Sequence, residues 1–372
     1  MRSRLAEAHS SVKTPAVRPS LLQVGFALGT LLGSSVQAQP PVVEKVALKA
    51  SEPIHWESRN QQSLESLIIQ KELSISLENC QDITITACDL HSVELANCQR
   101  ITFRNCWIHD SKRVGIQTYQ CREITVEGCR FENVSSGLYA MESQTIRFLG
   151  NFSRNVQGPF PRGQMIQLNQ VTGGGNLIQG NYAINDRGRS HPEDVINLYK
   201  SSGEAASPIV VEDNYLTGDP TAGSEGKSAT GSGIMLGDCG GAYITCRRNV
   251  VLDAGQCGIG VAGGHYIRVE DNLIVGGKSN VSNVGLYVWN QSHEPSDHIT
   301  IVRNHARWTD AKGEDSTWWN GGGAEQVEEK DNHFYEPLPP LPPPPSHASN
   351  PPHPWIKATA GSAAVIPVPW AP

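Results

Sequence analysis

Residues 190–203, SHPEDVINLYKSSG, place several side chains that can carry protons around one short apolar segment. Lys200 and Tyr199 can act as a general base or acid, and His191 can act as a second proton carrier. We predict these three as the catalytic residues. Their chemistry depends on the elements that position them, because the same residue types also occur in ordinary turns and strands.

Charged residues in and near this stretch complete a candidate site. Arg187 and Arg189 are predicted to bind substrate carboxylates, because a guanidinium group pairs with a carboxylate in a bidentate geometry. Glu193, Asp194 and Asp238 are predicted to bind calcium, which prefers carboxylate oxygens as ligands. Calcium is therefore the candidate cofactor.

Simpler structural roles are the alternative for several of these residues. Lys200 and Asp238 fall in one column of the chain's internal repeat, so an exposed ion pair that contributes little to stability would explain both. His191-Pro192 fits a turn, and Asp194 fits a cap on the loop before the strand.

The internal repeat consists of short strand patterns that end at a column of small polar residues. QDITITAC, QRITFRNC and REITVEGC read x-x-Ile-Thr-x-x-x-Cys, and later repeats have asparagine in place of cysteine. Apolar residues precede the column by five and three positions, which is the alternation of a half-buried strand. The column consists of Cys88, Cys106, Cys129, Asn151, Asn181, Asn214, Asn249, Asn272 and Asn304.

Repeats of this kind predict a solenoid. Each repeat is too short to bury its own apolar face, so neighbouring repeats must stack. Asparagine side chains at the bends can bond to the next coil and form a ladder. We predict an all-β fold, a single-stranded right-handed parallel β-helix of about nine or more coils, over residues 39–335.

The cysteines follow the same repeat in two columns. Cys80, Cys98 and Cys121 each lie eight positions before a cysteine of the main column. Stacked small side chains in the core explain them, and disulfides between adjacent coils are the alternative. The total of nine cysteines is odd, so at least one thiol stays free or pairs between chains.

A second strand in each coil predicts a surface that binds glycans. Its outward positions are rich in Tyr, Trp, Asn and Gln, and poor in Lys and Glu. Aromatic rings stack on the faces of sugars and amides bind hydroxyl groups. The longest loops, NDRGRSHPED and GDPTAGSEGKSATGS, are predicted to wall a cleft beside Lys200. The predicted substrate-binding residues on this face are Gln167, Asn169, Asn197, Tyr287 and Trp289.

The ends of the chain differ in composition from the repeats. Basic residues, an apolar run at 21–32 and Val36-Gln37-Ala38 predict a signal peptide over residues 1–38 and a periplasmic or secreted location. The apolar run is too short to predict stable membrane insertion. Residues 336–354 are predicted to be a proline-rich linker, and 355–372 a C-terminal tail.

The charge balance bears on the partners. The net charge is −7 and the basic residues form no stripe, so we expect no nucleic acid partner. The composition leaves the oligomeric state open.

The coil pattern resembles the pectate-lyase-like right-handed β-helix superfamily over roughly residues 60–335. DVINLYKSSG, followed one coil later by GSGIMLGD, is similar to the alginate lyase and chondroitinase B group. That group has an acidic residue, two apolar residues and a lysine before serine on its catalytic strand. Alignment on the apolar pair places Tyr199 at the lysine position, and alignment on Lys-Ser-Ser shifts the strand by one residue.

The resemblance implies an exported enzyme that cleaves a uronate-containing polysaccharide by β-elimination. In that group a lysine is the base, an arginine is the acid and calcium neutralises the substrate carboxylate; here the second strand offers no arginine. C5-epimerases share the fold, and His191, Glu193 and Asp194 fit their pattern. Hydrolases of this fold need two or three clustered aspartates on neighbouring coils, and only Asp194 and Asp238 qualify, so hydrolysis is less favoured. A non-catalytic glycan-binding or surface-assembly protein is the remaining alternative.

Overall fold

The computed structural model describes residues 47–186, 188–218 and 231–344. The predicted signal peptide, Arg187, most of the second long loop and the C-terminal tail lie outside these residues. Within them, regular structure consists of strands that pair in parallel, and no helix is long and apolar enough to cross a membrane.

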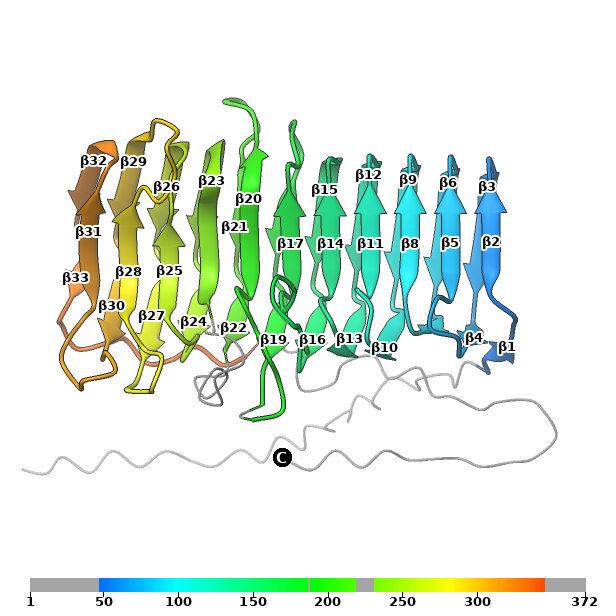
Figure 1. Ribbon diagram of the computed structural model, residues 1–372, viewed down its shortest axis with the longest axis horizontal. Helices are drawn as coiled ribbons and strands as arrows, with labels where there is room; N and C mark the ends of the chain where they lie inside the picture. Colours follow the sequence, from blue (N-terminus) through cyan, green and yellow to red (C-terminus); the bar gives the residue numbers. More distant parts are fainter. Residues whose placement is uncertain (1–46, 187, 219–230, 345–372) are drawn as a thin grey trace, which may run out of the picture. The chain divides into compact units, whose positions relative to one another are not determined.

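The strands form a 12-stranded and a 21-stranded parallel sheet that run along the molecule, and we call the two parts of the 21-stranded sheet, which meet at a bend in each coil, the first and second sheets (Figure 1). The first sheet stands in the middle of Figure 1. Its strands are β2 (Ile54–Glu57), β5 (Ile75–Glu78), β8 (Val93–Ala96), β11 (Ile116–Tyr119), β14 (Leu138–Met141), β17 (Ile166–Asn169), β20 (Ile196–Ser202), β23 (Ser232–Arg247), β25 (Cys257–Val261), β28 (Val284–Trp289) and β31 (Trp318–Gly322).

The second sheet follows the first across a sharp bend, and the long strand β23 takes part in both. Its other strands are β3 (Asn60–Glu65), β6 (Gln81–Thr86), β9 (Gln99–Arg104), β12 (Arg122–Glu127), β15 (Gln144–Leu149), β18 (Leu177–Gln179), β21 (Ile209–Glu212), β26 (His265–Glu270), β29 (Asp297–Val302) and β32 (Glu325–Lys330).

The third sheet closes each coil. Its twelve strands, one from each coil, confirm the prediction of nine or more coils. They are β1 (Lys49–Ala50), β4 (Leu67–Ile69), β7 (Asp89–Leu90), β10 (Trp107–Ser111), β13 (Arg130–Val134), β16 (Phe152–Arg154), β19 (Tyr182–Ile184), β22 (Tyr215–Thr217), β24 (Val250–Leu252), β27 (Leu273–Gly276), β30 (His305–Trp308) and β33 (His333–Phe334).

The core follows the alternation of the sequence. The predicted inward residues of the first sheet, such as Ile196 and Leu198 on β20, are buried. The asparagine column forms the predicted ladder: Asn214 Oδ1 accepts hydrogen bonds from the N–H and Nδ2 of Asn181, at 3.0 and 2.8 Å. Asn214 Nδ2 in turn donates to Asn249 Oδ1 at 2.9 Å.

All nine cysteines are free thiols, and only Cys239 is exposed. The cysteine columns continue the ladder with weaker bonds. The Cys106 N–H donates to Cys129 Sγ at 3.4 Å, and the Cys129 N–H donates to Asn151 Oδ1 at 2.9 Å. The cysteines therefore pack in the core, as the first interpretation predicts, and form no disulfides.

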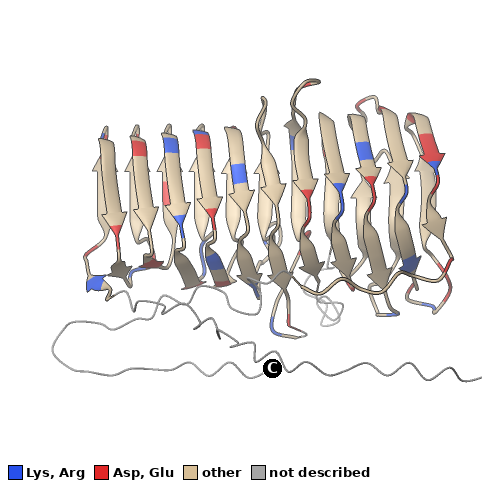
Figure 2. Ribbon diagram, turned by 180° about the vertical axis from the view of Figure 1, so that it is seen from behind, with Lys and Arg blue, Asp and Glu red and all other residues tan. Residues whose placement is uncertain are grey.

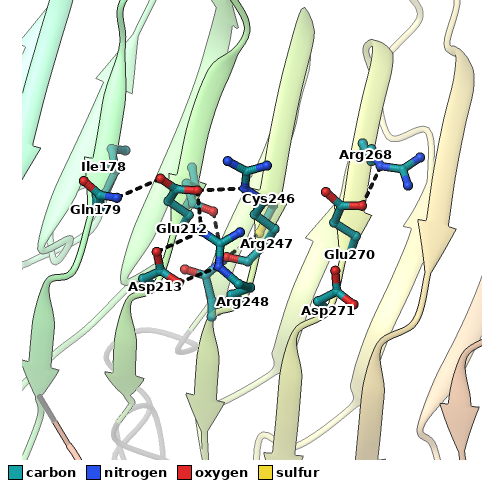
Figure 3. Close-up of polar contacts among 12 residues, drawn as sticks. Ile178, Gln179, Glu212, Asp213, Cys246, Arg247, Arg248, Arg268, Glu270 and Asp271 are labelled. Carbon is teal, nitrogen blue, oxygen red and sulfur yellow. Dashed lines mark hydrogen bonds and ion pairs between the residues drawn. The ribbon is translucent and has the colours of Figure 1, made fainter.

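Charged residues of both signs lie at the ends of the strands that are seen from behind (Figure 2). Glu212, at the end of β21, accepts hydrogen bonds from Gln179, Arg247 and Arg248 of the neighbouring coils (Figure 3). Arg248 also binds both oxygens of Asp213, at 2.8 and 2.9 Å. This network connects neighbouring coils along the second sheet.

Candidate functional site

A pocket of about 440 Å³ lies on the outward face of the first sheet, over β14, β17, β20 and β23. It contains seven of the predicted site residues, which the stacking of coils brings together from three strands and one loop. We call it the carboxylate pocket. Its lining consists of Tyr139, Phe160, Pro161, Arg162, Gln164, Gln167, Asn169, Glu193, Asp194, Asn197, Tyr199 and Asp238.

A hydrogen-bond network fixes the floor of the carboxylate pocket. Asn197 Nδ2 donates to Asp194 Oδ2 at 2.7 Å and to Asp238 Oδ2 at 3.0 Å. Asn197 Oδ1 accepts from Gln167 Nε2 at 3.4 Å. Asp194 Oδ1 accepts from the N–H and the Oγ of Ser232, each at 2.6 Å. The two aspartates are therefore held apart by one amide, and each keeps a defined orientation.

The carboxyl groups of the pocket differ in their tendency to hold a proton. Burial raises the pKa of Glu193 to about 7, and the nearby charges of Asp194 and Asp238 act in the same direction. Burial also raises the pKa of Asp194, although its hydrogen bonds from Ser232 and Asn197 oppose this shift. Glu193 is thus a proton donor close to neutral pH, which is the property of a general acid.

The position of Asp238 corrects the predicted column that it shares with Lys200. A register shift between β20 and β23 pairs Asp238 with Tyr199 instead. The extra residue is taken up at Gly237, whose φ of 61° lies in the left-handed region that glycine adopts readily. The shift turns the Asp238 carboxylate toward the pocket, where Asn197 binds it.

Lys200 lies outside the pocket lining. It occupies the bend between the first and second sheets with a φ of 47°, and its side chain is exposed. Its Nζ is 5.5 Å from the centre of the Tyr199 ring. Among the described residues Lys200 forms no ion pair with Asp238, so the structure does not contain the surface pair that was the simpler alternative.

The other predicted polar residues divide between two places. His191 is exposed and does not line the carboxylate pocket, although its backbone N–H donates to Val156 O at 2.7 Å. Arg189 lines a separate pocket of about 660 Å³, together with Asp110 and Lys112. The structure therefore does not bring His191 or Arg189 to the carboxylates.

The three predicted calcium ligands do not form a preformed metal centre. Both oxygens of Asp194 accept hydrogen bonds, and one oxygen of Asp238 does so too. In the described part of the chain, no group of three or more His, Cys, Asp or Glu side chains is arranged to hold a metal ion. These residues thus do not fit the predicted calcium site, and the chemistry below uses protein groups alone.

The loop at 157–163 forms a wall of the pocket that the sequence analysis missed. It places the Arg162 guanidinium 3.8 Å from the centre of the Tyr139 ring, and it exposes Phe160 beside them. Gln164 Nε2 donates to Pro161 O at 3.0 Å and holds the loop. The signal was present in the sequence, as an arginine and a phenylalanine next to prolines before a strand of the binding face.

Gly163 brings this wall close to the acidic stretch. Its φ is 124°, and a Cβ there would lie 2.5 Å from His191 O and 2.7 Å from the Glu193 nitrogen. The Glu193 N–H donates to Gly163 O at 3.0 Å. Only glycine permits this approach, which fixes the backbone of Glu193 against the loop that carries Arg162.

The two predicted aromatic residues lie farther along the same face. Tyr287 is buried, and its hydroxyl donates to Met235 Sδ at 3.3 Å and accepts from Gln291 Nε2 at 2.8 Å. Trp289 is 42% exposed and lies 5.5 Å from Trp319, measured between ring centres. Only Trp289 of the two predicted residues therefore presents a ring to solvent.

Comparison with known proteins agrees with this architecture. Residues 54–224 match the family model for a right-handed β-helix region. The chain matches no curated protein.

Solved structures of similar fold include PfbA, a surface adhesin of Streptococcus pneumoniae, at 12% identity and a TM-score of 0.46, over 78% of this chain and 71% of that one. A mannuronic acid specific polysaccharide family 6 lyase from human gut microbiota has 11% identity and a TM-score of 0.46, over 78% of each chain. A mutant of the periplasmic alginate epimerase AlgG has 13% identity and a TM-score of 0.41, over 77% of this chain and 76% of that one. The described part of the chain thus folds as a right-handed parallel β-helix.

Proposed function

We propose that the protein cleaves a uronate-containing polysaccharide by β-elimination in the carboxylate pocket. The observation that carries the proposal is that this pocket combines a proton-donating carboxyl group, Glu193, with a guanidinium group, Arg162, that has no acidic partner among the described residues. The low sequence identities to lyases and epimerases of this fold leave the reaction to be argued from the pocket.

Arg162 is suited to bind the carboxylate of a uronate. Its guanidinium lies over the Tyr139 ring, which holds the group in place while its edges stay available for hydrogen bonds. A carboxylate bound there shares its negative charge with the guanidinium. The negative charge that develops at the neighbouring C5 carbon is the main barrier to removing the C5 proton. The bound guanidinium stabilises that charge.

The two remaining roles fall to two carboxyl groups of the pocket. Asp238 takes the C5 proton, and the electron pair of the C5–H bond forms a C4–C5 double bond. The C4–O bond to the next sugar breaks, and Glu193 gives its proton to the leaving oxygen. Tyr199 is paired with Asp238 in register and lines the same pocket, so its phenol is the second candidate for the base.

Hydrolysis of a glycosidic bond is a second candidate, because Glu193 and Asp238 also resemble the acid and base of a glycosidase. In that reaction Asp238 would activate water and the substrate would need no uronate. The two reactions give different products. Only elimination creates an unsaturated uronate, which absorbs ultraviolet light.

The experiment is to incubate the purified protein with alginate, pectate and glycosaminoglycans and to follow ultraviolet absorbance and new reducing ends together. We expect both signals to rise with one of these polymers. Arg162→Met should lower kcat/KM by about 100-fold or more, and Glu193→Gln by about 100- to 10,000-fold. Arg189→Met is the matched control, because it removes an exposed arginine outside the pocket.

The outcomes separate the candidates. New reducing ends without ultraviolet absorbance would establish hydrolysis and reject elimination. No product from any polymer would reject both. Activity that a calcium chelator abolishes would contradict the role of Arg162 as the group that neutralises the substrate carboxylate.

A further inference from the structure

Two exposed tryptophans lie on the same outward face as the carboxylate pocket, toward the C-terminal coils. Trp289 on β28 and Trp319 on β31 are 42% and 45% exposed, and their ring centres are 5.5 Å apart. The rings are tilted by 56° to each other, so they do not cover each other's faces. Large indoles are usually buried, and two of them exposed side by side mark a binding surface.

The backbone around the two rings is shaped to accommodate them. A Cβ at Gly321 would lie 2.6 Å from the Trp319 ring and 2.8 Å from the Trp289 ring. A register shift after Val288 pairs Trp289 with Gly322 and leaves Gly321 between the two indoles. The backbone at Gly321 is not in the left-handed region, so glycine is needed there only because a Cβ would collide with the two indoles.

The tryptophans are continuous with the carboxylate pocket. Outward residues stack in register from Gln167 and Asn197 through Met235 and Gly260 to Tyr287. The Tyr287 ring lies over Gly260, and its hydroxyl reaches Met235, so it fills the floor between the pocket and the indoles.

The spacing matches an extended glycan. Coils stack about 4.7–4.9 Å apart, which is close to the length of one pyranose unit in an extended chain. Trp289 lies two coil steps beyond Asp238, and Trp319 lies three steps beyond it. A chain that runs along the coils would therefore reach the indoles about two to three sugar units from the reacting bond.

We propose that Trp289 and Trp319 form a second glycan-binding subsite, which stacks on the faces of sugar units that follow the unit bound in the carboxylate pocket. The inference rests on the proposed function, because it places both sites on one substrate chain. It assigns the protein to long, extended polysaccharides rather than to short oligosaccharides. The C–H faces of the sugars bind the indoles, and no described cation takes part.

Binding tests the subsite without requiring turnover. The Glu193→Gln protein is titrated calorimetrically with the polymers and with short and long oligosaccharides cut from them. Adding Trp289→Ala or Trp319→Ala should weaken the binding of long chains by about tenfold each. Binding of disaccharides, which fill only the carboxylate pocket, should not change.

Two further variants sharpen the test. Gly321→Ala keeps both indoles but forces them to move, so it should weaken long-chain binding as well. Tyr266→Ala is the matched control, because Tyr266 is 47% exposed on the second sheet, where it stacks on Tyr243 and His298. It should leave binding unchanged.

Unchanged long-chain affinity in the double tryptophan variant would overturn the subsite, and so would an equal loss in Tyr266→Ala. The failure of the proposed reaction would look different. In that case, no polymer is cleaved by the unmutated protein, while the tryptophan variants still show whether a glycan binds across both sites.

Discussion

Residue scale: the proposed chemistry depends on which carboxyl group of the pocket keeps its proton. Glu193 is partly shielded from water and faces the charges of Asp194 and Asp238, so its pKa is raised to about 7. The amide of Asn197 donates hydrogen bonds to both aspartates, and its bond to Asp194 opposes the rise that burial causes in the pKa of Asp194. The pocket thus holds a carboxyl group whose pKa lies near neutral pH, and general acid catalysis at pH 7 requires such a group.

This arrangement predicts a loss of activity above neutral pH. As the pH rises through about 7, Glu193 loses the proton that it must donate, so kcat/KM should fall about tenfold per pH unit. The measurement is the pH profile of kcat/KM on the substrate polymer. A profile that stays level well above pH 7 would show that Glu193 is not the acid.

The same group makes folding stability depend on pH. The unfolded chain releases the Glu193 proton near pH 4.5, whereas the folded chain keeps it up to about pH 7. The stabilisation is therefore complete below 4.5 and is lost as the pH rises through this window. Glu193→Gln should remove this part of the dependence, which denaturant unfolding at several pH values would measure.

Element scale: the coils are held in register by one polar side chain at each bend. Asn214 satisfies the backbone N–H of Asn181 and the carbonyl of Ile178, both of which lie in the buried interior. In the early coils, cysteine sulfur atoms accept the corresponding backbone hydrogen bonds at longer distances. Hydrogen bonding at the bends therefore fixes the register of the coils, in addition to apolar packing.

Substitutions in the ladder should reveal this difference. Asn214→Ala leaves buried donors and an acceptor unpaired and should lower the free energy of unfolding by about 3–5 kcal/mol. Cys106→Ala removes a small side chain with weak bonds and should cost about 1 kcal/mol. Denaturant unfolding measures both. Equal losses would mean that packing, and not hydrogen bonding, accounts for the contribution of this column to the free energy of unfolding.

The sequence predicts those features that follow from the repeat, and it fails where the repeat is interrupted. The alternation of Ile196 and Leu198 with Asn197 and Tyr199 gives the buried and outward sides of β20 correctly. The position of Asp238 could not be predicted from the repeat, because one extra residue at Gly237 shifts the register of every later side chain in β23. Arg162 belongs to a loop, and only the stacked coils show that this loop reaches the acidic stretch.

Whole-molecule scale: in a solenoid, the rigidity of a site depends on how many coils separate it from the ends of the molecule. Each coil contacts only its neighbours, so the stability of a coil depends on both adjoining coils. Ile54 and Trp56 in β2 are only partly buried, whereas the inward residues of β14 to β23 are buried from both sides. The carboxylate pocket lies on these middle coils, where neighbours on both sides restrict the motion of its side chains.

Hydrogen exchange should therefore vary along the molecule. Amides of β2 and β3 pair with one neighbouring coil only and should exchange fastest, because the end coil can open without disturbing the rest. Amides of β14, β17 and β20 should exchange slowest, because their exposure requires several coils to separate. Exchange measured by mass spectrometry on peptic fragments would resolve the gradient. Equal protection along all coils would mean that the solenoid opens as one cooperative unit, and the central position of the pocket would then give its side chains no additional rigidity.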